Sequence, residues 1–318
     1  MTSQRRLPFA LFLALVAGIQ FVSTAAGADY YLIQLTMAAY YSMTVLGLTL
    51  LMGYAGQISM GHAAFFAIGG YTTAVLTTHG HSPALALVLA LVLALGVAIL
   101  LGLPVLRLKG HYLAMATLGF GTIVYRVLLG GRLFGEADGL SDVPPMHIAP
   151  GLVISGASEY RVVNYYFAFG LVFLSMILLT GLIRSRAGRA LRALHGSEEA
   201  AAACGVDASR CKLAVFAISA CFACLGGVFL THYNGSIGPS EAGIMKSVRY
   251  VAIVAAGGMG NLWGTLFIGT LLNFMSLRGL FGSYDDAVFG VILIAIMLFA
   301  PEGVLNRGWL TQWKRSSK

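Results

Sequence analysis

Few side chains in the sequence have the types and spacing that enzyme chemistry requires. Cys221 and Cys224 form a C-x-x-C pair, but the pair lies inside an apolar stretch, so we interpret both as small buried packing residues. The seven histidines lie in loops and in separate apolar stretches, so they are not expected to converge as acid–base or metal-binding groups. Because no G-x-x-x-x-G-K-[ST] phosphate loop occurs, we predict no catalytic site, no metal site and no ATP hydrolysis by this chain.

Polar side chains accompany two glycine-rich stretches, one in each half of the chain. The stretches run from Gly53 to Gly61 and from Gly257 to Gly264. Interrupted helices free backbone groups that a bilayer tolerates only beside protein or water, so we expect the stretches to be helix breaks along a substrate path. Close helix packing through small residues is the alternative. The candidate path residues are Gln57, Ser59, His62 and Asn261.

The hydrophilic stretch 184–212 has the composition of short helices. Ser197 is a good N-cap, and Glu198 and Glu199 place negative charge at the positive end of the helix that follows. The alanines from Ala200 onward favour helix, and Gly205 can adopt the left-handed turn that ends it. The pattern predicts a short helix between two others. Three arginines precede it at helical spacing: Arg186, Arg189 and Arg192.

The elements that must position these residues are membrane-spanning helices. The sequence is 58% hydrophobic and 10% charged, whereas soluble domains are about 25% charged. Residues 85–103 contain no charge and thirteen Leu, Val or Ile, which favour insertion by roughly 4 to 8 kcal/mol. We predict ten apolar segments: 7–26, 33–52, 60–79, 83–106, 112–130, 164–183, 213–233, 247–259, 262–278 and 286–300.

The distribution of charge predicts the orientation. Arg5 and Arg6 precede the first segment, as in a signal peptide, but we expect a retained helix at 7–26. If ten spans alternate from a cytoplasmic N-terminus, fourteen of the twenty basic residues fall inside and eight of the twelve acidic residues outside. Both termini and the loop 184–212 are then cytoplasmic, and the loop 131–163 lies outside. The net charge of +8 is thus assigned to membrane orientation and not to nucleic-acid binding.

Six stretches of the sequence carry a family pattern. They are Gly53–Phe66, Leu106–Ala114, Thr117–Gly121, Gly188–Ala193, Gly257–Gly264 and Pro301–Val304. The pattern Glu199-Ala200-Ala201-x-x-x-Gly205 is similar to the loop of ABC importer permeases whose short helix docks in a cleft of the ATPase subunit. Together these stretches resemble the LivM-type permease subunits of branched-chain amino acid ABC importers, from about residue 33 to residue 304.

The resemblance implies an all-α membrane protein, a polytopic transmembrane helix bundle of about ten spans (8–10) with Gly-broken helices in each half. Residues 1–318 would form a single transmembrane permease domain in the bacterial cytoplasmic (inner) membrane. Its implied partners are the lipid bilayer, a homologous second permease subunit, two ATPase subunits that use ATP and Mg, and an extracytoplasmic solute-binding protein. The chain itself would bind no cofactor and would translocate branched-chain or related amino acids inward.

The sequence is also compatible with other transport functions. The same family contains permeases for urea, short amides and aromatic acids, and the sequence does not distinguish among these solutes. An ion-coupled secondary carrier usually keeps ionisable groups within its spans. No predicted span has Asp or Glu at its centre, which argues against proton coupling.

Overall fold

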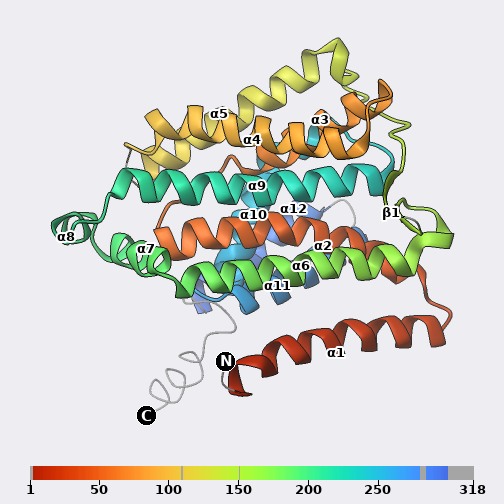
Figure 1. Cartoon of the computed structure of the whole chain (residues 1–318), viewed down its shortest axis with the longest axis horizontal. Coiled ribbons are helices and arrows are strands. Elements are labelled where there is room, and N and C mark those ends of the chain that lie inside the picture. The colour runs from red at the N-terminus through yellow and green to blue at the C-terminus, as the bar shows by residue number, and fades with distance from the viewer. Residues whose placement is uncertain (1–2, 109, 150, 280–283, 300–318) are drawn as a thin grey trace.

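The computed structural model describes residues 3–108, 110–149, 151–279 and 284–299, and the described chain is mainly helical (Figure 1). The matching stretch Pro301–Val304 and the predicted cytoplasmic C-terminus lie outside the described residues. The helices are α1 (Ser3–Ala25), α2 (Tyr30–Thr49), α3 (His62–Thr78), α4 (Pro83–Val105), α5 (His111–Gly130), α6 (Arg161–Arg184), α7 (Arg186–Gly196), α8 (Glu198–Ala203), α9 (Ala208–Asn234), α10 (Ile244–Gly257), α11 (Leu262–Leu277) and α12 (Asp285–Phe299).

Each of the ten predicted apolar segments overlaps one of these helices. Within the described residues, six helices are long and apolar enough to cross a membrane: α1, α2 with its continuation to Tyr54, α4, α5, α6 and α9. The other four predicted segments overlap the shorter helices α3, α10, α11 and α12, which have 17, 14, 16 and 15 residues. The chain is therefore an all-α membrane protein, and the number of spans stays a prediction.

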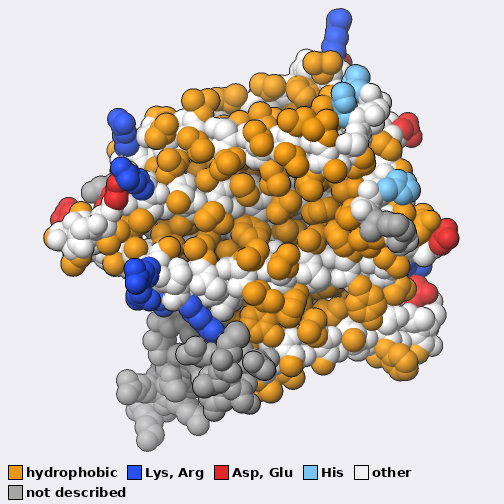
Figure 2. All heavy atoms as spheres, in the orientation of Figure 1, with side chains coloured by type: hydrophobic (Ala, Val, Ile, Leu, Met, Phe, Trp, Pro, Cys, Tyr) orange, Lys and Arg blue, Asp and Glu red, His pale blue; other side chains and the backbone are white. Residues whose placement is uncertain are grey.

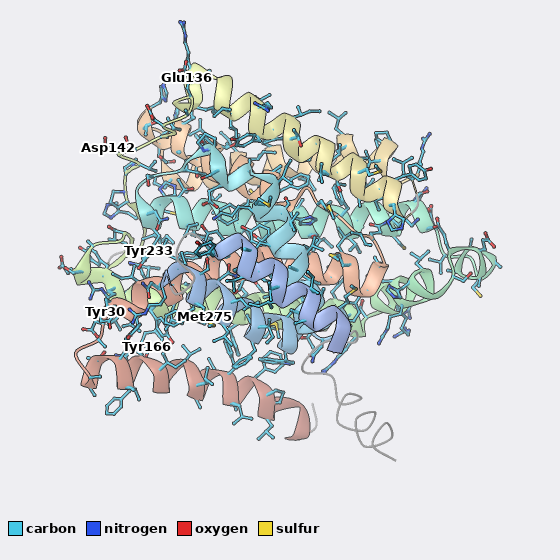
Figure 3. The ribbon with its side chains drawn as sticks, turned by 180° about the vertical axis from the view of Figure 1, so that it is seen from behind. Tyr30, Glu136, Asp142, Tyr166, Tyr233 and Met275 are labelled. Atoms are coloured by element: carbon cyan, nitrogen blue, oxygen red, sulfur yellow. The ribbon has the colours of Figure 1, made fainter. Side chains whose placement is uncertain are left out.

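The two ends of the bundle differ in structure and charge. α7 and α8 lie at one end, and the antiparallel strands β1 (Met146–Ala149) and β2 (Leu152–Ile154) lie at the other (Figure 1). Figure 2 shows lysines and arginines gathered at the α7–α8 end and an apolar band between the ends. Seen from behind, Tyr30, Glu136 and Asp142 lie at the end opposite α7 and α8 (Figure 3).

α9 lies at the centre of the bundle, where small residues let its neighbours approach. α4 presents Ala86, Ala90, Ala94 and Ala98 as one buried stripe at a spacing of four, while Leu89, Leu93 and Leu95 are exposed. A spacing of four places side chains on one helix face, so the alanines pack inward and the leucines face lipid. On this helix the small alanines are therefore buried and the large leucines are exposed, which is the reverse of a helix in a soluble protein.

The contact between α3 and α9 is closer still. A Cβ on Gly227 would overlap the carbonyl oxygen of Phe66, and one on Gly69 would overlap the carbonyl of Cys224. Cys224 is fully buried in this contact, and its neighbour Cys221 is partly buried. Glycine is needed at these positions because backbones in contact leave no room for a side chain.

α1 lies at the edge of the bundle, with most of its surface exposed (Figure 1). An apolar groove of about 420 Å³ separates it from α2 and α11 and is lined by residues such as Leu15, Leu35 and Phe274. Tyr165 of α6 donates a hydrogen bond to the carbonyl oxygen of Val16, at 3.0 Å. Whether α1 is retained in the mature protein stays a prediction.

Candidate substrate path and coupling site

The two glycine-rich stretches join α2 to α3 and α10 to α11, and they contact each other directly. After α2 the chain makes a π-helical turn over Leu50–Tyr54, and residues 56–61 before α3 are not helical. A Cβ on Gly53 would overlap the carbonyl oxygen of Met259, in the connection from α10 to α11. Tyr54 Oη donates a hydrogen bond to the carbonyl oxygen of Gly260 at 2.8 Å. Stretches about 200 residues apart in the sequence therefore form one junction.

Ser59 and His62 are tied to the surrounding helices. His62 Nδ1 is hydrogen-bonded to Ser59 Oγ (3.0 Å), and His62 Nε2 to Ser219 Oγ of α9 (2.5 Å). Both Ser59 and His62 are almost completely buried. Thr117 Oγ1 of α5 accepts a hydrogen bond from the backbone N–H of Met60 at 2.9 Å. These contacts fix the segment after the π-helical turn to α5 and α9.

Gln57 and Asn261 differ in their hydrogen bonding. Gln57 is 4% exposed, and neither its side-chain nitrogen nor its side-chain oxygen has a hydrogen-bond partner in the described part of the chain. Asn261 caps α11, because its Oδ1 accepts a hydrogen bond from the backbone N–H of Gly264 at 3.1 Å. Asn261 thus has a clear structural role, whereas Gln57 retains unused hydrogen-bonding capacity.

The stretch 184–212 forms two short helices, α7 and α8, between α6 and α9. Ser185 caps α7 and Ser197 caps α8, each accepting a hydrogen bond from the backbone three residues later. Gly205 has φ +79°, the left-handed conformation that ends α8. Lys212 Nζ lies 2.6 Å from Glu198 Oε2, which links α8 to α9. The short helix between two others that the sequence predicts is therefore present.

Most of the predicted coupling residues are exposed at the end of the molecule, where α8 projects from the bundle (Figure 1). Arg192 also donates to the carbonyl oxygen of Ile183 at 3.1 Å, which ties α7 to α6. His195 of α7 lies against Gly56, where an added Cβ would be 2.9 Å from its Nδ1. α7 thus contacts the glycine junction. The exposed residues are Arg186, Arg189, Arg192, Glu199, Ala200 and Gly205.

Comparison with known proteins identifies the family. Residues 30–299 match the family described as branched-chain amino acid transport system / permease component. The chain belongs to this family. The match covers most of the described helices, from the start of α2 to the end of α12, and includes both glycine-rich stretches and the α7–α8 pair.

Individual relatives agree with this assignment. The chain is 33% identical to the high-affinity branched-chain amino acid transport system permease protein LivM of Salmonella typhimurium over 292 residues, which are 85% of this chain and 68% of the relative. It is 32% identical to LivM of Escherichia coli over the same shares. It is 27% identical to the permease protein LivH of Salmonella typhimurium, over 86% of this chain and 93% of that relative. No solved structure matches the chain.

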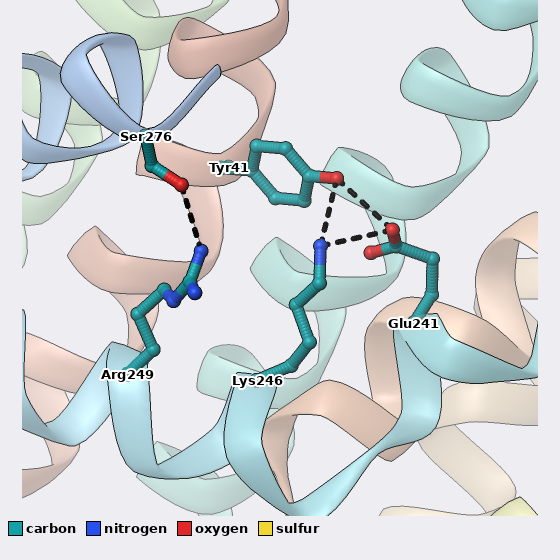
Figure 4. Close-up of polar contacts among 5 residues, drawn as sticks. All are labelled: Tyr41, Glu241, Lys246, Arg249 and Ser276. Atoms are coloured by element: carbon teal, nitrogen blue, oxygen red, sulfur yellow. Dashed lines mark hydrogen bonds and ion pairs between the residues drawn. The ribbon is translucent and has the colours of Figure 1, made fainter. Parts of the chain in front are cut away.

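This permease also holds a polar cluster that sequence reasoning missed (Figure 4). Lys246 Nζ lies 3.0 Å from Glu241 Oε1, and Tyr41 Oη donates to the same oxygen at 3.1 Å. Arg249 donates to Ser276 Oγ at 3.0 Å. Lys246 and Arg249 are among the six basic residues that the predicted topology leaves at or near the outer side, and Glu241 lies between predicted segments. The sequence offers one signal for this cluster: Glu241 and Lys246 lie among glycines between the predicted apolar segments 213–233 and 247–259.

Proposed function

We propose that this permease belongs to an ABC importer that carries branched-chain or related amino acids inward across the bacterial cytoplasmic (inner) membrane. The observation that carries the proposal is the family match over residues 30–299. The names of the relatives LivM and LivH support the solute class, and six long apolar helices support a membrane location.

The proposed assembly contains four kinds of subunit. The similarity of this chain to both LivM and LivH supports pairing with a homologous second permease subunit. Two ATPase subunits hydrolyse ATP with Mg on the cytoplasmic side. This chain itself binds neither ATP nor Mg. An extracytoplasmic solute-binding protein delivers the amino acid. This chain contributes a transmembrane path and a docking surface and catalyses no reaction.

We place ATPase coupling on α7 and α8. The exposed face of α8 around Glu199 and Ala200 suits docking in a cleft of an ATPase subunit. Closure of the ATPase pair would move α8, and the contact between His195 of α7 and Gly56 offers a route to the glycine junction. Motion there would reorient helices around a substrate path near Gln57, Ser59, His62 and Asn261.

We also propose the topology on which this mechanism depends. Residues 1–318 form one permease domain with about ten alternating spans, a retained first helix and cytoplasmic termini. The glycine-rich stretches act as helix breaks in each half. The gathering of lysines and arginines at the α7–α8 end supports a cytoplasmic location for that end (Figure 2).

The test is reconstitution in proteoliposomes of the chain with its second permease, ATPase and binding protein, followed by uptake of radiolabelled leucine. We expect uptake that requires ATP and is inhibited by excess valine or isoleucine. Inhibition instead by urea, short amides or aromatic acids would assign another solute of the family. Leucine transport by this chain alone without nucleotide would contradict the proposal.

A further inference from the structure

The polar cluster lies deep within the bundle. Tyr41 follows Tyr30 by eleven residues and precedes Tyr54 by thirteen, in one continuous helical segment. At about 1.5 Å per residue, Tyr41 is roughly 16 Å from the outer end and 20 Å from the other, close to the middle of a bilayer core of about 30 Å. Tyr41 is 6% exposed, and its hydroxyl contacts both Glu241 and Lys246. Charged groups at such depth are costly and mark functional sites.

A short helix brings the charges to this depth. After α9 the chain turns through the 3₁₀ helix Pro239–Ala242, which contains Glu241 and packs on α3 and α5. α10 then begins at Ile244 and has 14 residues, or about 21 Å, which is too short to cross the bilayer alone. Discontinuous helices of this kind form the substrate sites of many transporters near the bilayer midplane.

Two polar cavities flank Glu241 and Lys246. One, of about 100 Å³, is lined by Lys246, Arg249, Tyr250 and Asn273 among others. The other, of about 130 Å³, is lined by Glu241 and by polar residues such as Asn234. Each is large enough for several waters or for the head group of a small zwitterion.

Two buried polar atoms at these cavities lack a partner in the described part of the chain. They are Tyr250 Oη, on a side chain that is 1% exposed, and Glu241 Oε2. Buried polar groups are normally hydrogen-bonded, so both atoms are available to a guest. The Glu241 oxygen accepts only, whereas the tyrosine hydroxyl and the Lys246 ammonium donate.

We propose that this cluster binds the zwitterionic head group of an α-amino acid during translocation. Lys246 and Tyr250 donate hydrogen bonds to its carboxylate, and Glu241 Oε2 accepts one from its ammonium group. Arg249 already contacts Ser276 and Phe289, so the site does not depend on it. The inference rests on the proposed amino-acid transport and adds a binding site within this chain.

Tyr250→Phe is the sharpest test, because it removes only a hydroxyl that has no described protein partner. Tyr40→Phe is the matched control: the Tyr40 hydroxyl is also buried without a described partner, but Tyr40 lines neither cavity. With saturating liganded binding protein, we expect Tyr250→Phe to lower leucine uptake per ATP hydrolysed about tenfold and Tyr40→Phe to leave it unchanged. Wild-type uptake by Tyr250→Phe would overturn the proposal.

Exchanging the charges of Glu241 and Lys246 tests whether the pair binds the amino acid or only stabilises the fold. The double variant Glu241→Lys with Lys246→Glu keeps an ion pair but reverses its polarity. We expect the complex to assemble and hydrolyse ATP but to lose leucine uptake. The control exchange, Arg132→Glu with Glu136→Arg, alters an exposed pair and should leave uptake intact. Normal leucine uptake by the double variant of Glu241 and Lys246 would show that the pair has only a structural role and would overturn the proposal. Failure of the wild-type complex to transport leucine would instead contradict the proposed function.

Discussion

Gly53 determines how closely the two glycine-rich stretches approach. Because its missing Cβ leaves room for the Met259 carbonyl, we expect Gly53→Ala to separate the junction, lower the unfolding temperature and reduce uptake. Gly96→Ala in α4 is the control, since nothing lies within 4 Å of the added carbon and alanine favours helix by about 1 kcal/mol. The measurements are thermal unfolding and leucine uptake. Equal behaviour of the two variants would argue against a close junction.

His62 illustrates the difference between a packing residue and a gate. His62→Ala would remove the ring nitrogens that pair with Ser59 and Ser219, and each lost hydrogen bond costs about 0.5–1.5 kcal/mol. We therefore expect a lower unfolding temperature for this variant, measured in detergent. His111→Ala, at an exposed position, should change stability by less than about 0.5 kcal/mol. Unchanged stability with lost uptake would identify His62 as a transport residue instead.

At the scale of elements, α8 is the proposed point of contact with the ATPase. Glu199 is exposed in the first turn of α8, so Glu199→Arg alters the docking surface without disturbing the core. We expect this variant to insert normally, to lose copurifying ATPase and to abolish uptake. Glu159→Arg, exposed in the 3₁₀ helix before α6, is the control for the same charge change at the opposite end. Normal uptake by Glu199→Arg would remove α8 from the mechanism.

The elements that local pattern determines were predictable, and those that depend on tertiary pairing were not. Ser197 and Gly205 mark the ends of α8, because caps act within a few residues. The six long apolar helices were equally predictable, because each is a continuous apolar stretch in the sequence. The partial burial of Glu241 could not be predicted, because the residues before α10 have the hydropathy of a loop and its contacts with Tyr41 and Lys246 depend on tertiary packing. The roles of the predicted path and coupling residues stay predictions.

At the scale of the whole molecule, the bundle is an apolar band between two unlike polar ends (Figure 2). From the position of Tyr41 along α2 we place the charged Glu241–Lys246 pair within this band, where Tyr41 donates to Glu241 and the Glu241 and Lys246 side chains are 17% and 26% exposed. No predicted span has Asp or Glu at its centre, but Glu241 lies outside the predicted spans, so this criterion no longer separates the chain from a proton-coupled carrier. The requirement for nucleotide in the uptake assay therefore becomes the decisive distinction from an ion-coupled carrier.

The orientation of the whole bundle can be tested through a native cysteine. Cys204 is exposed at the end of α8, whereas Cys224 is buried, so a membrane-impermeant maleimide should react at Cys204 only from the α8 side. We expect labelling in right-side-out vesicles only after permeabilisation, and none there in a variant with serine at both Cys204 and the partly exposed Cys211. Asp138→Cys in that background places a thiol on the connection at the opposite end, and it should react without permeabilisation. Reversed accessibility would place α8 outside, where no ATPase could reach it, and the coupling mechanism would fail with the topology.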